Sequence, residues 1–150
     1  MSTIKKIYSS ILPGIYMFLG KTQLPYYPSK ISIESGNLCN LRCPLCPTGQ
    51  QDKSAQKGFI SFDVFKKVID EIGQSLTLIR LYNWGEPLLN KDLQRMIHYA
   101  KERCIDIKIS TNLSMRMEDD QLSELLKSGL EKIYISCNGA SPSTYIKYHA

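Results

Sequence analysis

The chain has 150 residues, 43% of them hydrophobic and 22% charged, which suits one modest globular domain and excludes a compositionally disordered chain. No apolar run approaches the roughly 20 residues that a membrane-spanning helix needs. The formal net charge is +5, but residues 1–30 hold four lysines and no acid, so the remainder is almost neutral and no nucleic-acid partner is expected.

Residues 1–30 are predicted to form a basic N-terminal extension and linker, separate from a core spanning residues 31–150. We expect Pro13-Gly14 to interrupt the apolar stretch that precedes it, and no clear signal-peptide cleavage site follows. The extension is expected to be a short helix packed on the body of the protein. Weak contact of residues 1–30 with a membrane surface is the alternative.

From Ile31 onward, short apolar runs alternate with amphipathic stretches. The runs predict strands at residues 31–35, 76–82, 105–109 and 133–135. A further helix begins at the capping pair Ser141-Pro142. The other predicted helices each carry an apolar face: Phe62, Phe65, Ile69 and Ile72 before Gly73; Leu93, Met96, Ile97 and Ala100 after a cap at Asn90; Leu122, Leu125 and Leu126 between Glu118 and Gly129.

Strands that alternate with helices predict an α/β fold with a parallel sheet. Ligands of such sheets bind outside the carboxyl ends of the strands. The polar loops of this chain all follow predicted strands, so we expect them to meet at one edge. They are a cysteine loop after the first strand, then residues 83–87, 110–112 and 136–139.

The cysteine loop holds Cys39, Cys43 and Cys46 in a C-x3-C-x2-C pattern. Three thiolates can hold three corners of an iron–sulfur cube and leave the fourth iron open to bind a small molecule. Three of five cysteines within eight positions favour a reducing, cytoplasmic setting over a disulfide scaffold. Cys104 and Cys137 are expected to be buried packing thiols.

Other interpretations of the loop stay open at this point. Cys43 and Cys46 alone could form a thioredoxin-like redox pair. A zinc site could combine the three cysteines with His98, Cys104 or His149, because zinc usually takes four ligands. His98 lies on an amphipathic helix and is expected to face solvent.

Residues 31–148 resemble the N-terminal part of the core domain of radical S-adenosylmethionine (radical SAM) enzymes. Within this family, they resemble the subgroup that carries a C-terminal SPASM extension. The resemblance rests on the cysteine loop, residues 83–89 and residues 136–145, in that order along the chain. It implies a partial (β/α) barrel, with about four of six βα units in this apparently truncated chain. We therefore expect the chain by itself to bind a cluster without efficient turnover.

The resemblance also implies cofactors and a reaction. The cofactors would be a [4Fe–4S] cluster on Cys39, Cys43 and Cys46, and S-adenosylmethionine on the fourth iron. Reductive cleavage of S-adenosylmethionine would yield a 5′-deoxyadenosyl radical that takes a hydrogen from a peptide or small-metabolite substrate. A one-electron reductant such as a ferredoxin or flavodoxin would supply the electron. The alternative is a non-catalytic iron–sulfur or zinc-binding module.

Further residues take cofactor-binding roles only through this resemblance. The turn Trp84-Gly85-Glu86-Pro87 would meet the methionyl amino group, and Leu45 would pack near the adenine. Ser136 would touch the ribose or carboxylate, and Asn112 would line the site. From the residues alone, Trp84 could instead be a core anchor and Glu86 a surface turn. No catalytic side chain is assigned.

Overall fold

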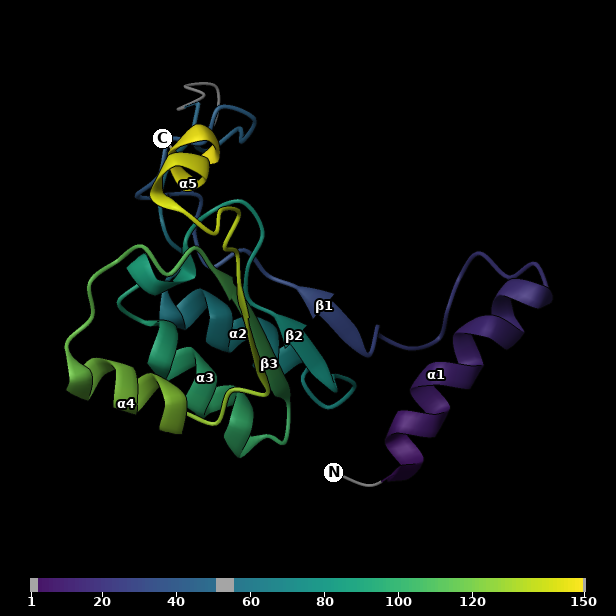
Figure 1. Ribbon diagram of the computed structural model, residues 1–150. Coiled ribbons are helices and arrows are strands. Elements are labelled where there is room, and N and C mark those ends of the chain that lie inside the picture. The colour runs from purple at the N-terminus through teal and green to yellow at the C-terminus, as the bar shows by residue number, and fades with distance from the viewer. Residues whose placement is uncertain (1–2, 51–55, 150) are drawn as a thin grey trace.

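A computed structural model describes residues 3–50 and 56–149 of the chain. Four short strands form one sheet in the order β1-β2-β3-β4, and every neighbouring pair is parallel (Figure 1). The strands are β1 (Lys30–Ser32), β2 (Leu78–Arg80), β3 (Asp106–Thr111) and β4 (Lys132–Ile135). The helices are α1 (Thr3–Phe18), α2 (Phe62–Ile72), α3 (Leu93–Glu102), α4 (Asp119–Lys127) and α5 (Pro142–Tyr148), with a 3-10 turn at Pro87–Leu89.

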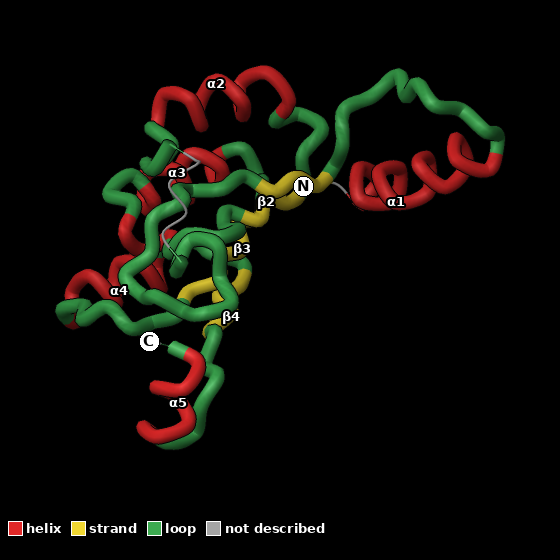
Figure 2. Tube along the Cα trace, turned by 90° about the horizontal axis from the view of Figure 1, so that it is seen from above, coloured by secondary structure: helices red, strands yellow, loops and turns green. Residues whose placement is uncertain are grey.

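Helices α2, α3 and α4 lie on the same side of the sheet in two perpendicular views (Figures 1 and 2). The core forms between this helical layer and the isoleucines of the strands, such as Ile79 and Ile107. The predicted stripe of α2 is confirmed, because Phe62, Phe65 and Ile69 are all buried. The helix begins where Ser61 accepts a hydrogen bond from the Val64 N–H.

The predicted cap at Asn90 is wrong. Helix α3 begins at Leu93 with Asp92 as its N-cap residue. The buried Asn90 amide instead donates to the carbonyls of Ser35 (2.8 Å) and Ile60 (3.1 Å). The Asn90 side-chain oxygen accepts the Asp92 N–H at 2.9 Å, so Asn90 shapes the turn before α3 while its amide group satisfies two carbonyls of other segments.

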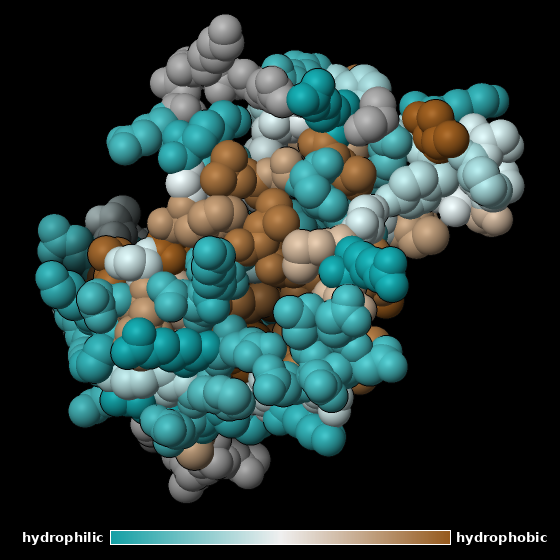
Figure 3. All heavy atoms as spheres, turned by 90° about the vertical axis from the view of Figure 1, so that its left-hand side faces the viewer, coloured by the Kyte–Doolittle hydropathy of each residue, from teal (hydrophilic) through white to brown (hydrophobic). Residues whose placement is uncertain are grey.

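The predicted apolar face of α4 is only partly buried. Leu125 is 2% exposed, whereas Leu122 and Leu126 are 40% and 64% exposed. Figure 3 shows apolar side chains gathered in a band on the side of the molecule that α4 borders. A single row of α4 therefore reaches the core, and two of the three predicted core leucines remain at the surface.

Helix α1 differs from the prediction in two ways. It runs through Pro13, whose missing N–H removes one helical hydrogen bond without ending the helix. It also projects away from the sheet instead of packing on it (Figure 1). Its described contact is with the linker, where the Tyr16 and Tyr26 rings meet edge to face at 5.7 Å. No helix among the described residues is long and apolar enough to cross a membrane.

Candidate metal and cofactor site

The loops that follow the strands meet at the carboxyl edge of the sheet, as predicted. The Asn112 side-chain amide, after β3, lies 3.5 Å from Cys39 Sγ and donates to Asn40 Oδ1 at 3.0 Å. The Glu86 N–H, after β2, donates to the Leu38 carbonyl at 2.8 Å. Hydrogen bonds therefore tie the cysteine loop to both neighbouring loops.

The cysteine loop is a compact turn. The Cys46 N–H donates to the Cys43 carbonyl (3.1 Å), and the Gln50 N–H donates to the Cys46 carbonyl (2.9 Å). Gly49 is buried against this turn, where a Cβ atom would lie 2.6 Å from the Cys43 backbone nitrogen and oxygen. All three cysteines are free and half-buried. The sequence thus folds this loop so that three unpaired thiols share one short, close-packed segment.

The donor set fits an iron–sulfur cluster. Burial and the charges of Cys39 and Cys46 raise the pKa of the Cys43 thiol above its usual range. Three thiols so placed repel one another when ionised, and a cationic cluster would remove that repulsion. In the described part of the chain, no three His, Cys, Asp or Glu side chains converge as ligands of a single ion. A cubane does not need such convergence, because each cysteine binds a different iron.

Glu86 is the most buried charged side chain at this edge, at 2% exposure. Its carboxylate accepts hydrogen bonds from Thr111 Oγ1 (2.7 Å), the Asn112 N–H (2.8 Å) and the Leu88 N–H (3.1 Å). The surface-turn interpretation of Glu86 is therefore wrong. Its carboxylate joins the β2 loop to the end of β3 and so fixes the backbone on which Asn112 stands.

Trp84 and Gly85 form the outer part of the same turn. Trp84 is 52% exposed, so it is not a core anchor. A Cβ atom on Gly85 would lie 1.7 Å from the Gly36 carbonyl oxygen, and only glycine allows that approach. The backbone N–H groups of Trp84 (2.8 Å) and Gly85 (3.3 Å) donate to the Glu34 carboxylate. Sequence reasoning missed Glu34, although an acid at the end of an apolar strand was a visible signal.

The remaining predicted residues lie around this centre. The Ser136 hydroxyl is 3.3 Å from that of Ser110, and the Ser136 N–H donates to the Thr111 carbonyl at 2.8 Å. Leu45 is 81% exposed, so it stands free of the described protein surface. The structure thus joins Cys39, Asn112 and the Glu86 turn directly, whereas Leu45 and Trp84 face outward.

His149 also reaches the cysteine loop. Its Nδ1 atom lies 3.2 Å from Cys43 Sγ. The side chain is 7% exposed, and its Nε2 atom is buried without a partner among the described residues. The rings of Tyr145 and Tyr148 pack against the imidazole at 4.5 and 5.0 Å. Of the three residues considered as a fourth zinc ligand, His149 is the one that reaches the cysteine loop.

The other residues considered for a zinc site do not join it. His98 is exposed on α3, as predicted. Cys104 precedes β3 and so lies at the opposite edge of the sheet from the cysteine loop. The expectation that Cys104 and Cys137 are buried is wrong, because both thiols are exposed. Cys104 lies in the turn between α3 and β3, and Cys137 lies in the loop after β4.

Comparisons with known proteins agree with this arrangement. A family model described as the Radical SAM superfamily matches residues 33–150. The PqqA peptide cyclase of Bradyrhizobium diazoefficiens is 30% identical over 116 residues, which cover 75% of this chain and 29% of that protein. The GTP 3′,8-cyclase of Campylobacter lari is 36% identical over 104 residues, 65% of this chain and 31% of that protein.

Solved structures share the fold. SuiB of Streptococcus suis bound to S-adenosylmethionine aligns with a TM-score of 0.66 and 13% identity, covering 99% of this chain and 34% of SuiB. BtrN in complex with AdoMet and 2-DOIA aligns with a TM-score of 0.64 and 23% identity, covering 75% of this chain and 46% of BtrN. The predicted parallel partial barrel is thereby confirmed.

A parallel α/β sheet with a three-cysteine loop at its carboxyl edge defines the core of an iron–sulfur enzyme. The chain belongs to the radical SAM superfamily. Enzymes of this superfamily use a [4Fe–4S] cluster and S-adenosylmethionine, in agreement with the predicted cofactors. The comparisons give no support to a non-catalytic module. The chain spans about a third or less of the length of the curated relatives it matches.

Proposed function

We propose that this chain carries the cofactor-binding part of a radical SAM enzyme, with Cys39, Cys43 and Cys46 as the three cysteine ligands of a [4Fe–4S] cluster. The observation that carries the proposal is the hydrogen-bonded junction of the cysteine loop with Asn112 and the Glu86 turn. Bound there, the cluster and S-adenosylmethionine supply the low-potential electron and the radical chemistry.

The chain's own residues hold and orient the cofactor in this proposal. Glu34 and Glu86 both fix the turn at residues 84–87 through hydrogen bonds, so its backbone would meet the methionyl amino group without reorganising. Asn112 and Ser136, after β3 and β4, offer polar side chains to the rest of the cofactor. Leu45, exposed beside Cys46, is free to cover the adenine.

The test is spectroscopic and chemical. The protein is reconstituted anaerobically with iron and sulfide, reduced, and examined by electron paramagnetic resonance with and without S-adenosylmethionine. An open iron predicts that the spectrum changes on addition and that 5′-deoxyadenosine forms under strong reductant. A spectrum that S-adenosylmethionine leaves unchanged, with no 5′-deoxyadenosine, would overturn the proposal in favour of a closed cluster or a zinc module.

The reaction partners follow from the same proposal. A ferredoxin or flavodoxin would supply electrons, and the substrate would be a peptide or a small metabolite. Relatives named as a peptide cyclase and as a GTP cyclase support both substrate classes. All five cysteines are free, which supports a reducing, cytoplasmic location.

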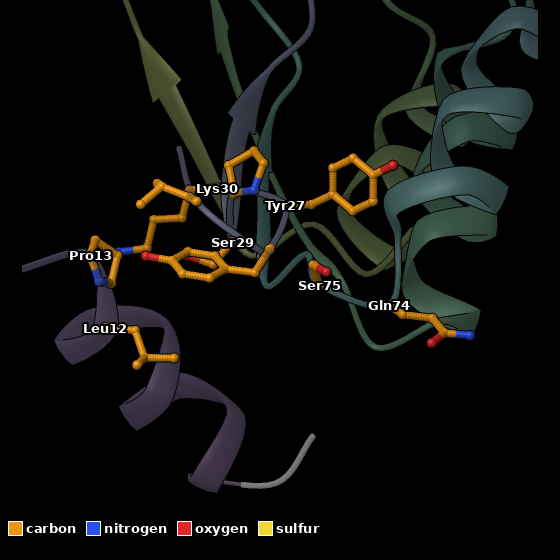
Figure 4. Close-up of a pocket in the computed structure, with 10 residues that line it drawn as sticks. Leu12, Pro13, Tyr27, Ser29, Lys30, Gln74 and Ser75 are labelled. Carbon is orange, nitrogen blue, oxygen red and sulfur yellow. The ribbon is translucent and has the colours of Figure 1, made fainter. Parts of the chain in front are cut away.

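Residues 1–30 are proposed to be a separate attachment segment that touches an anionic membrane surface weakly. In α1, Ile11, Ile15 and Phe18 are spaced as one helical stripe and are 54%, 47% and 90% exposed. Leu12, beside this stripe, lines a cavity of about 460 Å³ between α1, the linker and residues 74–75 (Figure 4). An exposed apolar stripe on a segment with lysines and no acids suits an anionic bilayer surface.

Vesicle flotation tests this attachment. The wild-type chain is expected to float with phosphatidylglycerol vesicles at low salt, and not with phosphatidylcholine vesicles. The double variant Ile11→Ser, Phe18→Ser should stay at the bottom of the gradient. Val64→Ser, at an exposed site on α2, is the matched control and should float. Equal flotation of all three chains, or self-association of the wild type through α1, would contradict the proposal.

A further inference from the structure

The two faces of the sheet differ sharply in chemistry. Isoleucines of adjacent strands pair in register on the face that the helices cover, as in the row Ile31, Ile79 and Ile107. A parallel sheet buried on both faces would carry apolar side chains on both. Here, except for Leu78 of β2, the strand residues on the second face are polar or charged, so this face is built for water or for a polar ligand.

One row of this second face holds three cations side by side. Arg80 of β2 is in register with Lys108 of β3, and Lys108 is in register with Lys132 of β4. Ser32 of β1 completes the row. Adjacent strands lie only about 4.8 Å apart, and like charges directly opposite one another destabilise a sheet. In a partial barrel, the face without helices is the inner one, so this row lies inside the barrel.

The cations of the row have no ion-pair partner among the described residues. No ion pair between described residues joins Arg80, Lys108 or Lys132 to a carboxylate. The acids with positions on this face are Asp106, which has interactions of its own, and Glu34, whose carboxylate accepts the N–H groups of the turn at residues 84–85. Lys132 lies over the Tyr134 ring at 4.7 Å, which holds its ammonium group near the face.

Hydroxyl groups lead from the cationic row to the carboxyl edge. Two residues further along the strands, Ser110 of β3 is in register with Tyr134 of β4, and Tyr82 of β2 contacts the Tyr134 ring at 6.2 Å. The Ser110 hydroxyl then meets that of Ser136 at the edge. At about 3.3 Å per residue, the row lies about 13 Å below Ser136. The face therefore offers hydrogen-bond donors over that whole length.

We propose that the substrate of this enzyme is an elongated oxyanion whose phosphate or carboxylate group binds the row formed by Arg80, Lys108 and Lys132. This inference rests on the proposed function, because it names the substrate class of that same site. Charge-assisted hydrogen bonds from three cations offset the repulsion within the row. The planar Arg80 guanidinium binds two oxygens at once, while the lysines act as point charges. The other end of the substrate then reaches the carboxyl edge.

Calorimetric titration with inorganic pyrophosphate, at constant salt, tests the inference without any need for turnover. Arg80→Gln and Lys108→Gln should each weaken pyrophosphate binding about tenfold, the loss expected for one hydrogen bond to a charged group. Lys127→Gln, at the exposed last turn of α4, is the matched control and should bind like the wild type. Parallel titrations with citrate show whether phosphate or carboxylate is the preferred oxyanion.

The outcomes separate this inference from the proposed function. Pyrophosphate and citrate that fail to bind the wild type, or that bind all variants equally, would overturn the oxyanion row. A third result would also overturn it: the wild type binds neither anion, and Arg80→Gln and Lys108→Gln melt at a lower temperature than the wild type. The row would then pair with acids of the same protein. A missing electron paramagnetic resonance response to S-adenosylmethionine would overturn the proposed function and leave the titration result standing.

Discussion

The Nδ1 atom of His149 lies 3.2 Å from the Sγ atom of Cys43, across 106 residues of sequence. This contact fastens the end of α5 to the middle of the cysteine loop. The imidazole is held in place by the Tyr145 and Tyr148 rings, and the Tyr145 hydroxyl bonds to that of Ser114. The loop that carries the proposed cluster ligands is therefore braced by a helix that follows the last strand.

His149→Ala should make the reconstituted cluster easier to lose. The variant removes a contact with the sulfur of a proposed cluster ligand and a buried ring that braces the loop, and such outer partners typically change metal affinity about 10- to 100-fold. The measurement is the rate at which a chelator bleaches the visible absorbance of the cluster. His98→Ala, on the exposed face of α3, should bleach at the wild-type rate. Equal rates for His149→Ala and the wild type would show that the contact does not support the cluster.

Glu86→Ala should lower the free energy of unfolding by about 3 kcal/mol, because the buried Thr111 hydroxyl and two backbone N–H groups lose their acceptor. Urea denaturation of the protein without its cluster measures the change. Glu86→Gln retains an acceptor oxygen and should lose less. Glu124→Ala, at an exposed position of α4, should change stability by less than about 0.5 kcal/mol. If Glu86→Ala lowered the free energy of unfolding as little as Glu124→Ala does, the Glu86 carboxylate would not stabilise the fold.

The sequence was sufficient to predict the order of the elements and the edge at which the loops meet. Both follow from local patterns: the apolar stripe of α2, the capping serine before α5, and loops rich in polar residues after each strand. Parallel topology then places the loops together, because the carboxyl ends of all strands point the same way. These inferences need only the spacing of the apolar residues along the chain and the common direction of the strands.

The features that sequence reasoning missed depend on contacts between distant segments. The Asn90 amide turns to carbonyls 55 and 30 residues away, and the Glu86 carboxylate accepts hydrogen bonds from Thr111 and Asn112, 25 and 26 residues away. Local capping rules cannot anticipate either choice. The cationic row was within reach, because Ile and polar residues alternate along β3 and β4. Only the strand register shows that Arg80, Lys108 and Lys132 stand side by side.

Gly85→Ala should disrupt the turn at residues 84–87. An added methyl group would lie 1.7 Å from a backbone carbonyl, and backbone on both sides leaves it no room to move. We expect a loss of roughly 2–4 kcal/mol in unfolding free energy, which is large for a single methyl group. Urea denaturation measures it. Gly58→Ala is the matched control, since nothing lies within 4 Å of its added methyl group. Equal stability of the two variants would refute the close approach of Gly85 to Gly36.

Replacing the cysteines one at a time should divide them into two sets. Cys39→Ala, Cys43→Ala and Cys46→Ala each remove one corner of the cluster, and two thiolates on a solvent-accessible loop should not retain it. Iron and acid-labile sulfide content after anaerobic reconstitution measures the loss. Cys104→Ala and Cys137→Ala remove exposed thiols outside the loop and should keep the full content. Loss of iron from either of these two variants, or full retention in any of the first three, would show that the ligand assignment is wrong.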